Sequence, residues 1–285
     1  MSAPRSAQLV AANLLPPVPE PLPWFRVVYK TFYKERWGSC KALTTRLHKY
    51  TVSNTPTANS VTIHFVRHGE GIHNVLAAKH QAKNGAAARP PYSMDNIDCL
   101  PDMIDAPLTL LGIQQAKENA VQTPFLSPQP DYLVSSPLQR ALVTGLVSFN
   151  FARPANTTGK VVVHEGARES FHSNNICDLR RNTAEIKQDF PFVDFSNIID
   201  DEPDVKYVGI DGENTDSVVD RMYDFMGWLW EDMERSGSKC VGVASHSVAL
   251  FALTNGVLHF EEGAEDGQSS MYGTGELRTY YIERT

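Results

Sequence analysis

The stretch from Val61 to Val75 places the strongest constraint on how this chain can fold. Its first part, Val61–Val66, is rich in apolar and β-branched residues, a composition that predicts a buried strand. The run breaks at Arg67-His68-Gly69-Glu70, and a segment suited to a helix begins near Ile72. Glycine lets the backbone turn sharply and approach a ligand closely. The stretch therefore predicts a strand whose exit presents Arg67 and His68.

An arginine next to a histidine at a strand exit suits phosphate chemistry. The guanidinium of Arg67 offers a planar fork of charged donors for phosphate oxygens. A neutral imidazole such as that of His68 is a nucleophile at physiological pH. The alternative is a strand end with a salt-bridging arginine and a surface histidine, because a given tripeptide occurs by chance in roughly a few per cent of chains this long. The other strand exits decide between the two interpretations.

Three later segments repeat the pattern of a strand followed by polar residues. The strands are expected at Asp131–Ser135, Lys160–Glu165 and Cys240–Ala244. A helix is expected to begin at Ser136-Pro137, because serine is a good N-cap and proline suits the first turn. The polar residues that follow the three strands are Arg140, Glu169 and His246. Arg140 falls in the first turn of its helix, where anions bind.

The alternation of strands and helices predicts a three-layer α/β/α fold with a mostly parallel sheet. The carboxyl ends of parallel strands share one edge of the sheet, and ligands bind there. Taken singly, Arg140 can be read as a surface residue, Glu169 as a partner of Arg168, and His246 as a core histidine. The four exits together favour one phosphate site over four coincidences. His64 is expected inside the strand, and His73 beside the loop.

Other elements follow from caps and periodicity. Thr109 is a plausible cap for an amphipathic helix. Apolar residues at helical spacing predict a long helix over Ser217–Glu234, and this stripe is interpreted as core. Residues Leu277–Ile282 are expected to form a late edge strand. The acidic run Asp200–Asp204 is interpreted as a solvated surface.

The chain is expected to consist of an N-terminal extension, residues 1–60, and a catalytic domain, residues 61–285, with a lid-like insertion over 171–217. The extension is proline-rich and then mixes aromatics with Lys and Arg. Its aromatics are interpreted as packing on the main fold, with contact to an anionic surface as the alternative. It contains eight Lys/Arg and two acids, a net of +6, so the remainder carries −7 − 6 = −13. This acidic body argues against nucleic acid as a partner.

Composition narrows the class of protein further. No run of eighteen apolar residues occurs, so no membrane span is expected. The four cysteines are scattered without a CxxC pair, which favours reduced thiols and a cytoplasmic location. Residues 1–13 lack acidic side chains but show no cleavage site, so secretion is not expected and organelle targeting stays open.

Five motifs, in this order, resemble the histidine phosphatase superfamily, the group related to cofactor-dependent phosphoglycerate mutase. They are Arg67-His68-Gly69-Glu70 with Asn74, Leu108-Thr109-x-x-Gly112 with Gln115-Ala116, Ser136-Pro137-Leu138-x-Arg140 with Thr144, Arg168-Glu169, and Ser245-His246. Within the superfamily, three segments are similar to the plant and fungal phosphoglycerate-mutase-like phosphatases: Cys177–Arg181, Phe190–Ser196 and Trp228–Trp230. Two positions depart from the pattern, because Ser170 replaces the usual histidine and Ser247 stands where glycine is common.

The resemblance implies a reaction in which His68 attacks phosphorus and forms a phosphohistidine that water then hydrolyses. It implies that Arg67, Asn74, Arg140 and His246 hold the phosphoryl group, with Glu169 as general acid and then base. The other ring nitrogen of His68 is expected to donate to a backbone carbonyl. Neither a metal nor a cofactor is expected, and the chain has no HExxH, Asp-x-Asp-x-Asn loop or P-loop.

Arg180 and Arg181 are further candidates, for binding a second anionic group of the substrate. The equally weighted alternative is that they pair with Asp178, Glu185 or the acidic run. The expected function is hydrolysis of a small phosphorylated metabolite. A phosphomutase is the first alternative, although Gly71-Ile72-His73-Asn74 lacks the Ser-x-Trp of the true mutases. The second is a catalytically idle binding or scaffold protein, which the presence of every catalytic residue type disfavours. Neither the substrate nor the oligomeric state follows from the sequence.

Overall fold

The structure is a computed structural model that describes residues 46–85, 90–93, 103–151, 159–170, 175–198, 204, 213–263 and 270–285. Its strands are β1 (Tyr50–Ser53), β2 (Val61–Arg67), β3 (Tyr132–Ser135), β4 (Val161–His164), β5 (Asp194–Asn197), β6 (Cys240–Ser245), β7 (Leu258–Phe260) and β8 (Leu277–Arg284). Its α-helices are α3 (Ile72–Asn84), α4 (Leu110–Gln122), α5 (Gln139–Ser148), α6 (Thr183–Asp189), α7 (Thr215–Ser236) and α8 (Ser247–Gly256). The short 3-10 turns are η3 (Thr123–Phe125), η4 (Glu165–Ala167) and η5 (Ile176–Asp178).

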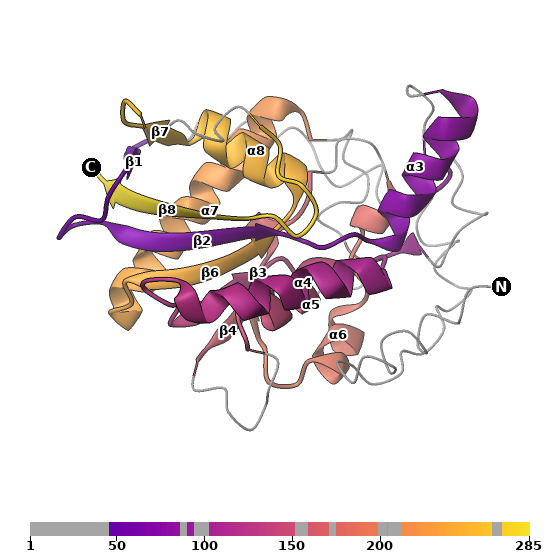
Figure 1. Cartoon of the computed structure of the whole chain (residues 1–285), viewed down its shortest axis with the longest axis horizontal. Helices are drawn as coiled ribbons and strands as arrows, with labels where there is room; N and C mark the ends of the chain where they lie inside the picture. Colours follow the sequence, from indigo (N-terminus) through magenta and orange to yellow (C-terminus); the bar gives the residue numbers. More distant parts are fainter. Residues whose placement is uncertain are drawn as a thin grey trace.

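The eight strands form one sheet in the order β5-β4-β3-β6-β2-β8-β1-β7. The five strands from β5 to β2 pair in parallel, and β8 runs antiparallel to both β2 and β1. Helices cover both faces of this sheet (Figure 1), so the expected three-layer, mostly parallel α/β/α class is confirmed. Strands β4, β3, β6 and β2 are neighbours, and their carboxyl ends lie at the same edge.

Alternating side chains of the strands supply two separate core layers. Phe65 and Val243 pack with α7 and α8 on one face of the sheet. Val66 and Ala244, the next residues along the same strands, pack with α4 and α5 on the other face. Both faces are apolar because a parallel sheet is covered by helices on each side. The central strands are thereby held rigidly, and the residues at their exits have fixed positions.

One expectation about the ends of the sheet needs correction. The strand near the C-terminus, β8, lies between β2 and β1 rather than at an edge. Charged residues such as Arg278 and Arg284 are unusual in an internal strand. Both fit here because their side chains pair with Glu276 and Glu234 at the surface. Strand β1 falls within the expected extension yet pairs with β8 and β7. Residues 1–45 lie outside the described residues, so the division of the chain stays a prediction.

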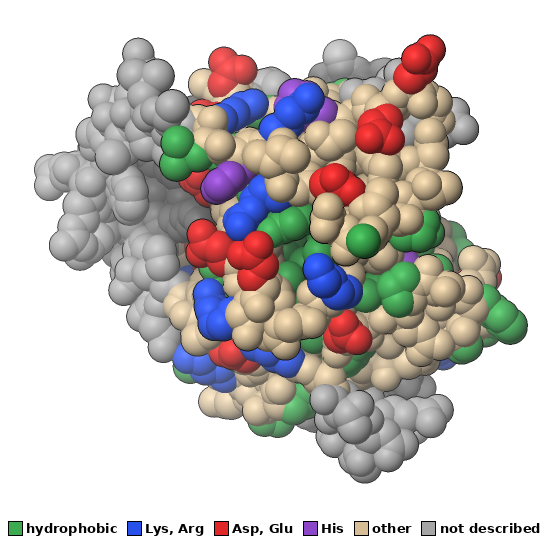
Figure 2. All heavy atoms as spheres, turned by 90° about the vertical axis from the view of Figure 1, so that its left-hand side faces the viewer, with side chains coloured by type: hydrophobic (Ala, Val, Ile, Leu, Met, Phe, Trp, Pro, Cys, Tyr) green, Lys and Arg blue, Asp and Glu red, His purple; other side chains and the backbone are tan. Residues whose placement is uncertain are grey.

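The expected insertion over 171–217 contributes regular elements where the structure describes it. They are η5, α6 and β5, and β5 pairs with β4 at the edge of the sheet. The role of this insertion as a lid stays a prediction. Within the described residues, no helix is long and apolar enough to cross a membrane. Figure 2 shows the face at the amino ends of the parallel strands and the carboxyl end of β8, where acidic and basic side chains are intermixed.

Candidate active site

The loop that leaves β2 is held by backbone contacts on several sides. The amide of His68 donates to the carbonyl of Ser245, the last residue of β6, at 3.0 Å. The amide of Gly69 donates to Thr144 Oγ1 at 3.0 Å, and Thr144 in turn donates to the carbonyl of Arg140 on α5. The exits of β2 and β6 and the first turn of α5 are therefore joined directly.

The imidazole of His68 is buried and has one defined hydrogen bond. Its Nδ1 lies 2.7 Å from the carbonyl oxygen of Gly69. A carbonyl oxygen only accepts, so Nδ1 carries the proton and Nε2 keeps its lone pair. Burial lowers the pKa of His68 well below its usual value, and the charges of Arg140 and Arg67 lower it further. The expected backbone carbonyl is found, and Nε2 has the electronic state of a nucleophile.

His246 lies directly beside His68, with the ring centroids 5.1 Å apart. Its Nε2 is 2.8 Å from the hydroxyl of Ser136, and its buried Nδ1 has no hydrogen-bond partner. Burial and the charge of Arg140 lower the pKa of His246 well below its usual value. The expectation that Ser136 caps a helix is wrong, because α5 begins at Gln139 and its N-cap is Leu138. The hydroxyl of Ser136 contacts His246 instead and also accepts from the backbone amide of Leu138 at 3.2 Å.

His73, in the first turn of α3, is the third histidine of this cluster. Its ring centroid lies 5.4 Å from that of His68, and its buried Nδ1 has no hydrogen-bond partner. Gly71 makes room for it, because a Cβ at this position would stand 2.5 Å from that nitrogen. Burial, together with the charge of Arg140, lowers the pKa of His73 well below its usual value. The sequence placed His73 beside the loop but gave it no role.

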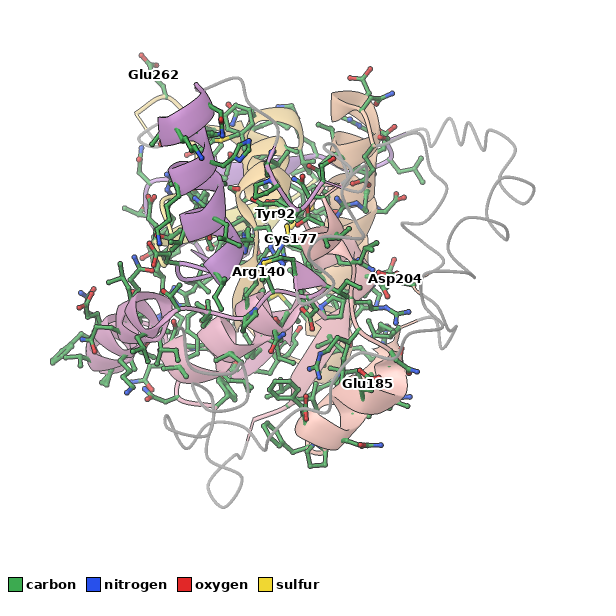
Figure 3. All side chains as sticks on the ribbon, turned by 90° about the vertical axis from the view of Figure 1, so that its right-hand side faces the viewer. Tyr92, Arg140, Cys177, Glu185, Asp204 and Glu262 are labelled. Carbon is green, nitrogen blue, oxygen red and sulfur yellow. The ribbon has the colours of Figure 1, made fainter. Side chains whose placement is uncertain are left out.

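Two arginines flank the histidines. Arg67 donates through Nη1 to the carbonyl of Tyr272 at 2.6 Å. Arg140 donates through Nη1 to the carbonyl of Cys177 at 2.6 Å and through Nη2 to Asp178 Oδ1 at 2.8 Å. The Nε atoms of Arg67 and Arg140 are both buried and unpartnered. Figure 3 shows Arg140 close to Tyr92 and Cys177 at the side where the strands end.

Glu169 and Asn74 lie at the ends of two helices that border the cluster. The carboxylate of Glu169 accepts from the backbone amides of Ser170, Val248 and Ala249 at 2.9, 3.2 and 3.2 Å. The hydroxyl of Ser247 also donates to Glu169, at 3.2 Å. Both departures from the family pattern, Ser170 and Ser247, thus contact this carboxylate. Asn74 accepts from the amide of Gly71 at 2.9 Å, and this contact orients its side chain.

Arg180 and Arg181 take part in buried ion pairs. Arg180 Nε lies 2.9 Å from Glu165 Oε1, and its backbone amide donates to Asp204 at 2.8 Å. Arg181 pairs with Asp105 at 3.1 Å and with Asp189 at 2.7 Å. Asp204 is 4% exposed, so the interpretation of the acidic run as a solvated surface is wrong at that residue. These pairs favour the structural alternative for both arginines, and their binding of a second anion stays a prediction.

The site combines a neutral histidine, the buried Arg140, the half-buried Arg67 and several buried nitrogen atoms that have no hydrogen-bond partner. This combination suits phosphoryl transfer, because the transition state of that reaction carries negative charge on the phosphoryl oxygens. Within the described part of the chain, no group of three or more His, Cys, Asp or Glu side chains is placed to hold a metal ion.

Comparison with known families agrees with this geometry. Residues 96–267 match the histidine phosphatase superfamily (branch 1), which is more than half of the chain, and the chain belongs to this superfamily. The match begins after the Arg67-His68 loop, so the place of that loop in the site rests on the contacts described above.

Individual relatives extend the comparison. A phosphoglycerate mutase-like protein of Arabidopsis thaliana is 30% identical over 222 residues, covering 70% of this chain and 75% of the relative. Among solved structures, phosphoglycerate mutase from Bacillus anthracis is 14% identical with a TM-score of 0.48, covering 80% of this chain and 91% of that one. A putative alpha-ribazole-5'-P phosphatase from Escherichia coli is 18% identical with a TM-score of 0.46, covering 80% and 94%.

Proposed function

We propose that this protein is a phosphomonoester hydrolase that acts on a small phosphorylated metabolite through a phosphohistidine on His68. The observation that carries the proposal is the state of His68, whose Nδ1 donates to the Gly69 carbonyl at 2.7 Å and leaves Nε2 unprotonated. Two arginines beside it keep a buried Nε donor without a partner. A phosphoryl group supplies the oxygens that such donors lack.

In the first step, Nε2 of His68 forms a bond to phosphorus while the ester P–O bond breaks. The leaving alkoxide takes a proton, which we assign to the carboxyl group of Glu169. In the second step, water attacks phosphorus, Glu169 takes its proton, and the P–N bond breaks to release phosphate and restore His68. General acid–base catalysis of this kind contributes about 10²–10⁴-fold to the rate.

Charge stabilisation is assigned to Arg67 and Arg140, with neutral donors from His246 and Asn74. The lowered pKa of His246, caused by burial and by Arg140, makes it a neutral N–H donor. Each preorganised donor in a buried site contributes about 3 kcal/mol to lowering the barrier. The arginines act in both steps, because the phosphoryl oxygens stay between them.

A phosphomutase is the second candidate, favoured by the phosphoglycerate mutase-like relative in Arabidopsis thaliana. A mutase must return the phosphoryl group to a second hydroxyl before water reaches the phosphohistidine. Gly71 and His73 together replace the Ser-x-Trp of the true mutases, and the ring of His73 fills the space beside Gly71. Because the Ser-x-Trp of the true mutases is missing, we favour hydrolysis over the mutase reaction. Measuring phosphate release and isomer formation on one phosphoglycerate separates the two.

The nucleophile is tested with 4-nitrophenyl phosphate and with a ³²P-labelled substrate in rapid-quench experiments. The wild type is expected to hydrolyse the ester and to trap acid-labile label, and His68→Ala is expected to lose both. His259→Ala is the matched control, because His259 lies on β7 and is exposed. Full activity in His68→Ala contradicts the proposal. A screen over sugar phosphates, phosphoglycerates, nucleotides and phosphopeptides then identifies the substrate.

A further inference from the structure

The turn η5 holds both terminal nitrogens of Arg140. The carbonyl of Cys177 accepts from Nη1 at 2.6 Å, and Oδ1 of Asp178 accepts from Nη2 at 2.8 Å. Arg140 is only 1% exposed, and its Nε has no hydrogen-bond partner. One short turn of the insertion therefore fixes the guanidinium from one side and leaves Nε available to the phosphoryl group.

Hydrogen bonds to other parts of the chain hold η5 in place, and this fixes the two acceptors that it offers to Arg140. Arg168 donates through Nη2 to the carbonyl of Asp178 at 2.5 Å. The amide of Ile176 donates to the carbonyl of Tyr92 at 3.1 Å, and Ile176 is fully buried. Arg168 also binds Asp204 through both of its terminal nitrogens. These hydrogen bonds connect the insertion to the segment that follows β4.

We propose that Asp178 is a positioning residue for the phosphate site: its carboxylate holds the guanidinium of Arg140 in the orientation that stabilises the transferred phosphoryl group. The inference rests on the proposed function and assigns a role to a residue that does not contact the reacting atoms. A guanidinium bound at one carboxylate oxygen and one carbonyl cannot rotate freely about its last bonds. A misplacement of about 1 Å at a catalytic group costs about 10²-fold in rate, so the acceptor on Nη2 matters for turnover.

The charge of Asp178 changes within the pH range of an enzyme assay. Burial raises its pKa to about 6, although the charge of Arg140 opposes the rise. The other charged or titratable groups around it are Glu169 and Arg168 beyond η4, Tyr92 across from η5, and its neighbour Cys177. Above this pH the bond joins the guanidinium cation to a carboxylate anion, and below it the bond joins the same cation to a neutral carboxyl. Protonation of Asp178 therefore removes the Coulombic attraction between the two groups, which is strong at a buried site.

Asp178→Asn removes the charge but keeps an oxygen that can accept from Nη2. Its kcat/KM on 4-nitrophenyl phosphate is expected to be about tenfold below wild type at pH 7.5 and to match it at pH 5. The ratio of wild type to variant isolates Asp178, because the ionisation of the substrate cancels. The loss is expected in kcat rather than KM, which is the signature of an interaction made in the transition state. Asp178→Ala removes the acceptor and is expected to lose about 10²-fold at both pH values.

Asp232→Asn is the matched control for loss of a buried carboxylate. Asp232 lies on α7, is 3% exposed, and pairs with Lys160 and Arg235. The ratio of the wild-type kcat/KM to that of Asp232→Asn is expected to be independent of pH, whatever effect the substitution has on Tm. A flat ratio for Asp178→Asn as well, or wild-type kcat at pH 7.5, overturns the inference.

Orthovanadate, which adopts the trigonal geometry of the transferred group, provides a measurement that needs no turnover. Calorimetry at pH 7.5 is expected to show about tenfold weaker vanadate binding to Asp178→Asn than to wild type, with inorganic phosphate changed by less than about threefold. If wild type hydrolyses no ester, the proposed function fails, and vanadate still decides the role of Asp178. Equal vanadate affinity in the two proteins then overturns it.

Discussion

The backbone of Gly69 lies directly against the backbone of Gly112, at the start of α4. A Cβ added to Gly69 would stand 2.8 Å from Gly112 Cα, and it would overlap the carbonyl oxygen of Gly112. A Cβ on Gly112 would stand 2.8 Å from the amide nitrogen of Glu70. The loop that carries His68 is therefore fixed by a glycine-to-glycine contact between two motifs 43 residues apart (112 − 69).

Gly112→Ala is expected to destabilise the protein by about 1–3 kcal/mol, the usual cost of overpacking. It is also expected to reduce phosphatase activity more than tenfold, because the added methyl group displaces the loop that positions His68. Urea unfolding and kcat/KM on 4-nitrophenyl phosphate measure the two effects.

Gly227→Ala is the matched control for this substitution. Gly227 lies inside α7, where an added Cβ would meet only the hydroxyl of Tyr50 at 3.7 Å. Replacing glycine by alanine inside a helix stabilises by about 0.5–1 kcal/mol. Equal effects of the two substitutions would show that the Gly69–Gly112 contact does not fix the loop.

Asp204→Ala is expected to destabilise the protein by about 3–5 kcal/mol, because two buried arginines, Arg168 and Arg180, pair with this carboxylate and with Glu165 and would lose one of these counter-charges. Asp204 accepts from both terminal nitrogens of Arg168 at 2.9 and 2.7 Å, and Arg168 is fully buried. Thermal and urea unfolding measure the effect. Asp220→Ala is the control, since Asp220 pairs with Arg46 at the surface and such pairs contribute about 0–1 kcal/mol. A loss for Asp204→Ala no larger than for the control would contradict a structural role for this network.

The candidate site could be predicted because its residues lie at the exits of neighbouring parallel strands. Arg67 is the last residue of β2, His68 and His246 directly follow β2 and β6, and Arg140 and Glu169 follow β3 and β4 by a few residues. A local pattern, a strand followed by polar residues, is enough to bring such residues to one edge of a sheet. The fold class followed from the same alternation.

Residues placed by tertiary packing could not be predicted in this way. His73 reaches His68 only because Gly71 leaves space for its ring. Asp178 reaches Arg140 from an insertion whose sequence has no strand or helix periodicity to orient it. The sequence favours a solvated Asp204 because the four residues before it in the run are acidic or proline. It is buried because it pairs with Arg168. The partners of Asp178 and Asp204 are distant in sequence and lie at no fixed spacing from them, whereas the contact of His73 depends on how the loop between it and His68 is folded.

EDTA is expected to leave the hydrolysis of 4-nitrophenyl phosphate unchanged, because the proposed mechanism assigns charge stabilisation to Arg67 and Arg140. Enzyme dialysed against EDTA is assayed alone and after addition of Mg²⁺, Mn²⁺ or Zn²⁺. Arg67→Ala is expected to lose at least about 10²-fold in kcat in the same assay, the usual effect of removing one preorganised donor. Loss of activity with EDTA and its recovery with a metal would replace this assignment with a metal-dependent one.

The stability of the fold is expected to fall as the pH drops below about 6.5, because the histidine cluster resists protonation. Burial lowers the pKa values of His68, His73 and His246 well below their usual value, with Arg140 contributing to each. The unfolded chain binds protons at these positions near pH 6.5 and the folded chain does not. Stability therefore rises with pH through this window and is lost on acidification, by up to about 1.4 kcal/mol per pH unit for each histidine.

Asp178 acts in the opposite direction at lower pH. Its raised pKa of about 6 means that the folded chain holds this proton after the unfolded chain has released it, so its contribution to stability falls as pH rises toward 6. The three clustered histidines and Asp178 together are expected to contribute a net slope of about 3 kcal/mol per pH unit at most between about pH 4 and 6. Urea unfolding at pH 7.5, 6.5 and 5.5 measures the slope. His73→Phe is expected to reduce the slope by about 1.4 kcal/mol per pH unit at most, because one fewer proton is bound on unfolding. A free energy of unfolding that is constant from pH 7.5 to 5.5 would show that the cluster accepts protons in the folded state.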